Sequence, residues 1–242
     1  MRSEPHSLRA FYASRQGAVA AGLIQARLRA IWPDVAGCAV LGVGYGMPFL
    51  RPWRDQARRC VAITPAQLGL ARWPAGRPGL SCVSEEDALP FPDLCFDRVL
   101  LVHGLEVAEN PRLLLRDIWR VLKDDGRLLV VAANRRGLWA HVEATPFGQG
   151  RPFSAGQLSR LLTDCLFRPE RRDVALFMPP LSARPVLRGA PMIERVGRRL
   201  LPSLAGVALS EASKDLLASI PAHAVLARWR ARSRRVLVAD GA

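Results

Sequence analysis

Five short apolar runs, separated by segments of helical periodicity, constrain the fold of this 242-residue chain more than any other feature. No tight hairpin turn joins one run to the next. Apolar strands that alternate with helices form a parallel sheet, in which each helix crosses over from one strand to the next. The pattern therefore predicts an α/β fold with a parallel sheet. The expected strands are 38–43, 59–63, 80–84, 97–102 and 127–133.

Helical patterns surround these strands. An amphipathic helix is expected over 7–32, ended by Pro33, and a short helix over 48–57. Another is expected to begin at Thr64, the N-cap, with Pro65 at its first helical position. The remaining expectations are a helix from Asn110-Pro111, helices over 154–166 and 192–201, and strands over 174–178 and 206–213.

The composition favours a single domain. Half of the residues are hydrophobic, and no linker or repeat divides the chain, so we expect one domain over 1–220. Residues 1–36 form its leading helical segment, and 221–242 form a basic C-terminal tail. No apolar run is long enough to span a bilayer, and the N-terminus has no signal-peptide pattern. Five scattered cysteines without a CxxC pair predict a cytoplasmic protein with no metal site.

A glycine-rich turn follows the first expected strand. Gly42, Gly44 and Gly46 alternate with larger residues, and glycines in such a turn let the backbone approach a nucleotide-like ligand. A dinucleotide site would require the spacing G-x-G-x-x-G and an acidic residue at the end of the second strand. The spacing here is G-x-G-x-G, and that strand ends at Thr64. An NAD site is therefore disfavoured.

Three blocks in the expected order resemble the class I S-adenosylmethionine-dependent methyltransferases. Residues 40–46 stand where that family has its glycine-rich first motif. Residues 87–99 (DALPFPDLCFDRV) are similar to its D-A-x-x-L-P-F-x-D-x-S-F-D-x-V block. Residues 120–126 (RVLKDDG) are similar to its R-V-L-K-P-G-G segment. The resemblance covers about residues 38–133 and implies a Rossmann-like, doubly wound, mostly parallel seven-stranded sheet flanked by helices, with an antiparallel last strand.

The resemblance also implies a function: transfer of a methyl group from S-adenosylmethionine to oxygen or carbon of a small molecule. Asp87 then takes the position that hydrogen-bonds the adenine amino group. In this fold the loop after the fifth strand lies over the substrate pocket, which makes Trp139, Phe147 and Arg151 candidates for substrate binding. The expected cofactor contacts are Gly42, Gly44, Tyr45, Gly46, Ile63, Thr64, Glu86, Asp87, Ala88, Val102 and His103.

His103 is the candidate catalytic residue. It ends the fourth strand, where the family's substrate meets the methyl group, and its ordinary pKa suits proton abstraction at neutral pH. Methyl transfer is an in-line displacement that orientation and desolvation alone can promote. A loop or cofactor-contact histidine is therefore the alternative for this residue.

Departures from the family pattern favour a second hypothesis. Gly42 and Thr64 replace acidic residues that hold the methionine end and the ribose, and Pro48 replaces a glycine. A catalytically inactive binding or interaction protein that retains the fold is the alternative. An RNA methyltransferase is a third hypothesis, which only the net charge of +14 favours. The motifs for methylating base amino groups or the cytosine ring are missing, so a nucleic acid is not the favoured partner.

Overall fold

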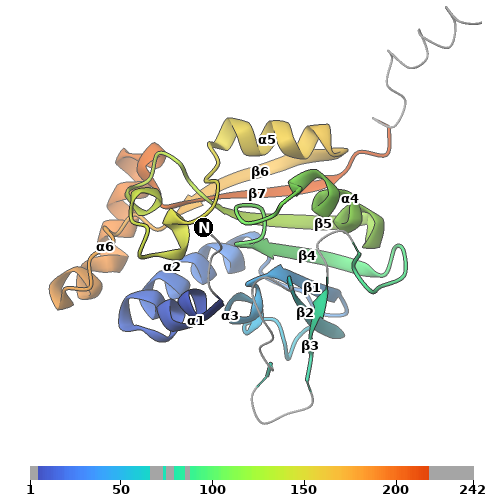
Figure 1. Cartoon of the computed structure of the whole chain (residues 1–242), viewed down its shortest axis with the longest axis horizontal. Helices are drawn as coiled ribbons and strands as arrows, with labels where there is room; N and C mark the ends of the chain where they lie inside the picture. The colour runs from blue at the N-terminus through green and yellow to red at the C-terminus, as the bar shows by residue number, and fades with distance from the viewer. Residues whose placement is uncertain (1–4, 66–72, 75–78, 85–87, 218–242) are drawn as a thin grey trace, which may run out of the picture.

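A single seven-stranded sheet organises the chain in the computed structural model, which describes residues 5–65, 73–74, 79–84 and 88–217 (Figure 1). The strand order is β3-β2-β1-β4-β5-β7-β6. Strands β1 to β5 pair in parallel, and β7 runs antiparallel to both of its neighbours, β5 and β6. The doubly wound fold predicted from the sequence, with its antiparallel last strand, is confirmed.

The elements have the following bounds. The strands are β1 (Ala39–Gly44), β2 (Arg59–Pro65), β3 (Ser81–Ser84), β4 (Phe96–Val102), β5 (Leu122–Ala133), β6 (Phe167–Ala175) and β7 (Val207–Lys214). The α-helices are α1 (Pro5–Ala13), α2 (Arg15–Ile31), α3 (Met47–Leu50), α4 (Pro111–Val121), α5 (Ala155–Asp164) and α6 (Arg184–Leu200). The described residues also include the short 3₁₀ helices η2 (Leu138–His141), η3 (Pro146–Gly148) and η4 (Pro202–Leu204).

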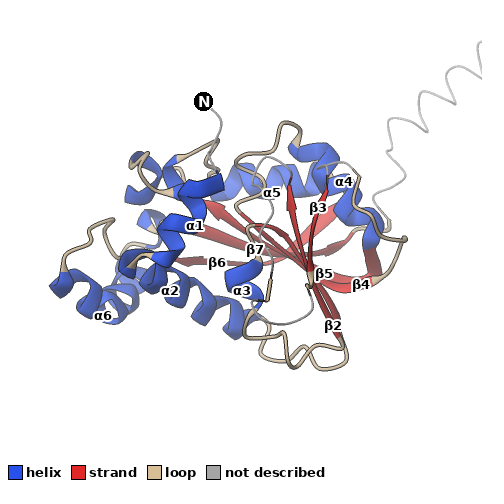
Figure 2. Cartoon of the chain, turned by 60° about the horizontal axis from the view of Figure 1, so that its bottom comes forward, coloured by secondary structure: helices blue, strands red, loops and turns tan. Residues whose placement is uncertain are grey.

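Helices cover both faces of the sheet (Figure 2). Side chains of successive strand residues point to opposite faces, so Val40 packs with α1, α2 and α3, whereas Leu41 packs with α4 and α5. Both faces of β1 are buried along its whole length. A strand buried on both sides needs a continuous apolar run, and this explains why the sequence indicated β1 so clearly.

Several boundaries differ from the sequence predictions. The expected helix over 7–32 is two helices, because Ser14 caps α2 by accepting a hydrogen bond from the Gly17 amide. The helix expected over 48–57 is only the single turn α3. Thr64 and Pro65 are the last residues of β2, and the helix expected after them lies outside the described residues.

Three later elements begin earlier than expected. β5 starts at Leu122, with a register irregularity against β4, and β6 starts at Phe167. α6 starts at Arg184, well before the expected 192. Pro185 lies in its first turn, where a missing amide hydrogen costs nothing, and Pro191 lies on the exposed side of the helix.

Within the described ranges, each helix is too short or too polar to cross a lipid bilayer. The predicted basic tail over 221–242 lies outside the described residues.

Candidate functional site

The carboxyl ends of β1, β2 and β4 meet at one edge of the sheet. Gly44 of β1 is paired with Val102 of β4, and Val43 is paired with Ile63 of β2. Gly44 has φ +81°, and a Cβ at this position would lie 2.3 Å from the Val102 carbonyl oxygen. The Tyr45 amide donates to that same oxygen at 2.8 Å. Glycine is therefore required here because the turn approaches β4 so closely.

Thr64 ends β2 beside this turn. Its side chain is buried, and among the residues that the structure describes its Oγ1 has no hydrogen-bond partner. A buried hydroxyl without a partner costs about 1–3 kcal/mol. The position corresponds to the family's ribose-binding acid, and a ligand hydroxyl at this place would satisfy Oγ1. The residue therefore fits the ribose end of the expected cofactor.

Gly42 shows a different relationship to the family pattern. A Cβ at this position would lie 2.5 Å from Cδ1 of Leu50, which is fully buried. The Leu50 side chain thus fills the space that a side chain at position 42 would enter. The acidic residue of the family's first motif has been replaced by apolar packing, which removes one polar anchor for the methionine end of the cofactor.

Helix α1 brings two aromatic residues to this edge, and the sequence analysis did not identify them. The ring of Tyr12 stacks on that of Tyr45 with 5.4 Å between centroids, and it meets Phe49 edge-on at 5.5 Å. Its hydroxyl is hydrogen-bonded to Nε2 of His103 at 2.6 Å. The adjacent pair Phe11-Tyr12, which only Ala13 separates from the capping Ser14, is the sequence signal that would have pointed to them.

His103 follows β4 and is buried, with φ +51°. A non-glycine residue in the left-handed region costs about 1 kcal/mol and marks a constrained position. Burial lowers the pKa of His103 to about 3. The imidazole is therefore neutral near pH 7, and Nε2 shares a hydrogen bond with the Tyr12 hydroxyl whose direction depends on the imidazole tautomer. Such a group is suited to orienting a hydroxyl; as a proton carrier it is weak.

Glu106 is a second buried titratable residue at this edge that the sequence analysis missed. Its Oε1 accepts from the Ala133 amide at 2.6 Å, while Oε2 has no partner within the described part of the chain. Burial raises the pKa of Glu106 to about 7. The Arg151 amide donates to the Glu106 carbonyl at 2.8 Å. A Cβ on Gly150 would lie 2.2 Å from that same carbonyl, so the loop after β5 is anchored closely at Glu106.

The structure brings two of the three predicted substrate residues toward His103. Phe147 and Trp139 are fully buried and pack edge-on at 5.2 Å, and the Phe147 ring lies 5.0 Å from that of His103. Phe11 packs against both aromatic residues. The Trp139 indole donates to the Met178 carbonyl, so its polar atom is already used. Arg151 is exposed and is tied to the site through its backbone.

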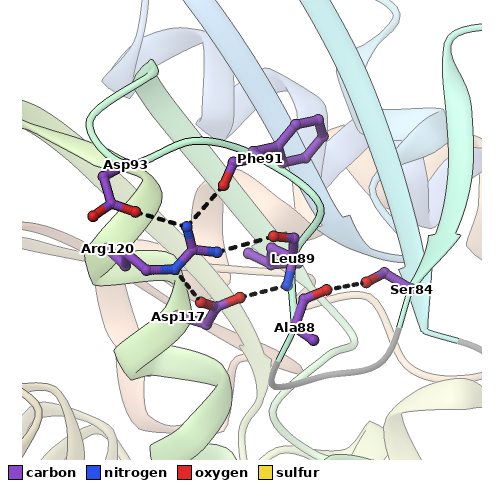
Figure 3. A network of polar contacts seen from close by, with 7 residues as sticks. All are labelled: Ser84, Ala88, Leu89, Phe91, Asp93, Asp117 and Arg120. Carbon is purple, nitrogen blue, oxygen red and sulfur yellow. Dashed lines mark hydrogen bonds and ion pairs between the residues drawn. The ribbon is translucent and has the colours of Figure 1, made fainter.

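The loop before β4 is held by one arginine of α4 (Figure 3). Arg120 donates to the carbonyls of Phe91 and Leu89 at 2.7 and 2.9 Å, and to the carboxylate of Asp117 at 2.6 Å. Asp117 in turn accepts from the Leu89 amide. Ala88, a predicted cofactor contact, lies in this loop, and its carbonyl accepts from Ser84. The other two predicted adenine-side residues, Glu86 and Asp87, lie outside the described ranges.

A cavity of about 640 Å³ lies at the opposite edge of the sheet. It is lined by residues that include Asp93, Leu113 and Trp119, near the amino ends of β4 and β5. In open α/β sheets, ligands bind at the carboxyl ends of the strands. This cavity is therefore not the predicted cofactor site, which in this structure is covered by the aromatic residues of α1.

Comparison with known proteins shows which proteins this chain resembles. Residues 39–130 match the family model described as a methyltransferase domain. The chain is also 31% identical, over 105 residues, to the uncharacterized protein Rv2003c of Mycobacterium tuberculosis. That match covers 40% of this chain and 37% of Rv2003c, so the chain spans little more than a third of the curated relatives it matches.

Two solved structures have the same fold. One is the complex of a Haloferax volcanii methyltransferase with the Trm112 methyltransferase activator, at 19% identity and TM-score 0.60, covering 88% of this chain and 97% of the other. The second is 1,6-didemethyltoxoflavin-N1-methyltransferase of Burkholderia thailandensis, solved with S-adenosylhomocysteine, at 17% identity and TM-score 0.51. That match covers 83% of this chain and 78% of the other.

The family model and the fold together confirm the resemblance to class I S-adenosylmethionine-dependent methyltransferases. They also support S-adenosylmethionine as the cofactor.

Proposed function

We propose that this chain is a methyltransferase that transfers the methyl group of S-adenosylmethionine to a small molecule, at oxygen or carbon. One observation carries the proposal: a buried threonine hydroxyl without a partner at the end of β2, beside the glycine turn. Burying such a group is unfavourable unless a ligand hydrogen-bonds it. A ribose hydroxyl is the ligand group that we expect at Thr64.

The predicted contact residues can be assigned to successive parts of the cofactor. Gly42, Gly44, Tyr45 and Gly46 would surround the methionine end. Ile63 and Thr64 would contact the ribose, and Glu86, Asp87 and Ala88 the adenine. Val102 and His103 would lie next to the transferred methyl group. When bound, S-adenosylmethionine supplies an electrophilic methyl group on a sulfonium. These assignments follow the order of the strand ends in the sheet.

The chain's own part in the reaction is orientation and the exclusion of water. The neutral imidazole of His103 is suited to form a hydrogen bond with an acceptor hydroxyl, as it does here with Tyr12. Phe147 and Trp139 make the surroundings of His103 apolar. In-line displacement is promoted when the two reactants are held in line and water is excluded. An acceptor would take the place of the Tyr12 hydroxyl, so α1 would have to move to admit it.

A small acceptor is supported by the enclosure of His103 among aromatic rings, which favours a flat or apolar molecule. Arg151, at the outer end of the loop, would select for a negative group. The cysteines at 38, 60, 82, 95 and 165 are all free thiols, which supports the proposed cytoplasmic location.

A second candidate function is a non-catalytic binding protein. The observation that favours it is Leu50, which fills the space of the family's first acidic side chain. An RNA methyltransferase is supported by charge alone, and a steep salt dependence of RNA binding would favour it.

Calorimetric titration with S-adenosylmethionine, S-adenosylhomocysteine and NAD tests the proposal. We expect heat with both sulfur ligands and none with NAD. If neither S-adenosylmethionine nor S-adenosylhomocysteine gives heat at about millimolar concentration, the proposal is contradicted. If both bind but no small-molecule mixture leads to formation of S-adenosylhomocysteine, the non-catalytic protein is favoured.

A matched pair of variants tests whether the buried Thr64 hydroxyl binds the cofactor. Thr64→Val and Ser210→Ala each delete a buried hydroxyl without a hydrogen-bond partner, and Ser210 lies on β7, away from the glycine turn. We expect Thr64→Val to weaken binding of S-adenosylhomocysteine about five- to tenfold, and Ser210→Ala to leave it unchanged. Neither variant should lose stability, because no hydrogen bond is removed. Equal affinities in both variants would refute the role of Thr64.

A further inference from the structure

Helix α6 has an unpartnered outer face at one end of the molecule, beside α2 (Figure 2). Three apolar residues of this face follow one another at intervals of four: Met192 is 61% exposed, Val196 46% and Leu200 67%. Residues spaced by four lie one above the other on a helix. Together they form a continuous apolar row. Leu181 before the helix, and Leu201 and Leu204 after it, are also exposed.

A row of arginines runs beside the apolar row. Arg188, Arg195 and Arg199 are exposed, and helical spacing places them along one edge of the Met192, Val196 and Leu200 row. The only acid of the helix, Glu194, is buried and accepts hydrogen bonds from the Leu176 and Phe177 amides. The outer face is therefore apolar and cationic, without a compensating carboxylate of its own helix.

The opposite side of α6 fixes this orientation. Ala190 and Glu194 are buried, and Gly197 lies so close to Phe177 that an added Cβ would be 2.7 Å from its side chain. The apolar row cannot turn inward without breaking these contacts. Its exposure is thus a property of how the helix packs on the sheet.

The positive charge on the outer face of α6 limits which kind of molecule can cover it. A second copy of the chain would bring the same arginines against it. The basic tail also carries the wrong sign, with Arg228, Arg230, Arg232, Arg234 and Arg235 against the single acid Asp240. An anionic occupant with a broad apolar layer therefore complements this face. A helix with an apolar row flanked by arginines matches the boundary between lipid headgroups and acyl chains.

We propose that α6 docks this protein on the surface of an anionic lipid bilayer. The aliphatic row enters the boundary between headgroups and acyl chains, and the arginines contact the lipid phosphates. The helix lies in the plane of the surface and does not cross it. This inference is independent of the proposed methyl transfer.

Vesicle sedimentation of the full chain tests the inference, with vesicles of phosphatidylcholine alone and vesicles containing about 30% phosphatidylglycerol. We expect binding to the anionic vesicles only. The variant Met192→Gln/Val196→Gln/Leu200→Gln keeps the net charge and should bind about tenfold or more weakly, because the apolar row is lost. The variant Arg188→Gln/Arg195→Gln/Arg199→Gln should also bind at least tenfold more weakly.

The matched control is Leu94→Asn/Leu113→Gln/Leu217→Gln, which removes exposed apolar residues outside α6 and also keeps the net charge. It should bind anionic vesicles like the parent chain. Four outcomes would overturn the inference: no binding of the parent chain, an equal loss in the control, unchanged binding of the Met192/Val196/Leu200 variant, or a parent dimer in sedimentation equilibrium that this variant dissociates. The second and third would show adsorption unrelated to the α6 row, and the fourth a second copy of the chain.

Discussion

The Tyr12 hydroxyl is hydrogen-bonded to Nε2 of His103 at 2.6 Å, and this bond joins the first helix to the end of β4. Burial holds His103 neutral, since it lowers the pKa of the imidazole to about 3, and burial likewise raises the pKa of Tyr12 well above its usual range. Both partners are therefore uncharged over the whole neutral range. Through this bond α1 contacts the predicted site at His103, the residue expected to face the methyl acceptor.

Tyr12→Phe removes this bond and keeps the ring packed on Tyr45. We expect the free energy of unfolding to decrease by about 1–2 kcal/mol, because Nε2 of His103 is left buried without its hydrogen-bond partner. Denaturation with urea measures the change. Tyr45→Phe is the control. It removes the hydroxyl of the other ring in the stacked pair, and the stacking itself needs only the ring. An unchanged midpoint for Tyr12→Phe would show that the bond does not contribute to stability.

Most of the sheet was predictable because its strands are buried on both faces. Continuous apolar runs such as Leu128–Ala133 leave few alternatives to a central parallel strand. Edge strand β6 was less clear, because its residues Arg168, Glu170 and Arg171 are polar and stay in water. The periodicity of apolar residues reflects which positions are buried. It could therefore not show where a mostly exposed strand such as β6 begins.

The candidate site was predictable only in part. The glycine turn and Thr64 could be located because they follow strands. Tyr12 and Glu106 could not, since their place depends on how α1 folds back and on how the loop after β5 approaches β4. Leu50 is a similar case: no local pattern indicates that its side chain fills the space beside Gly42. Contacts between distant segments are set by packing, which a single sequence does not encode locally.

Gly42→Asp restores the family's acidic residue and tests whether Leu50 excludes it. We expect a loss of about 1–3 kcal/mol in unfolding free energy, because the new Cβ would lie 2.5 Å from Leu50 Cδ1. Leu50→Ala alone creates a cavity and should cost about 2–4 kcal/mol. The double variant should lose less than the sum of the two, with a coupling energy of about 1 kcal/mol or more. Strict additivity in this double-mutant cycle would contradict the steric account.

Glu106→Gln tests the buried carboxyl through pH. The folded chain, with a Glu106 pKa of about 7, binds this proton more tightly than the unfolded chain, with an ordinary value of 4.5. The contribution of Glu106 to stability is therefore present below pH 4.5 and is lost as the pH rises toward 7. Glutamine does not titrate, so relative to the parent the variant should gain about 2–3 kcal/mol between about pH 5 and pH 8.

Chemical denaturation across this pH range measures the difference between the two proteins. His103 titrates in both and cancels from the comparison. A stability difference that does not change with pH would show that Glu106 is not a protonated, buried acid near neutrality.

Arg120→Ala tests how the loop before β4 is held. The variant removes the donors to the Leu89 and Phe91 carbonyls and leaves the mostly buried carboxylate of Asp117 with only the Leu89 amide (Figure 3). We expect a loss of about 2–3 kcal/mol in unfolding free energy, since a charged group loses its partner at a partly buried site. Arg120→Lys should recover part of this loss, because a lysine keeps the charge but not the fork of donors.

The matched control is Arg116→Ala, one turn earlier on α4, where the side chain is exposed. Its unfolding free energy should stay within about 0.5 kcal/mol of the parent value. Because the Arg120 contacts hold the segment that follows the predicted adenine-binding residues, Arg120→Ala should also weaken S-adenosylhomocysteine binding while Arg116→Ala does not. A loss of stability in Arg120→Ala with full ligand affinity would separate the two roles and restrict Arg120 to folding.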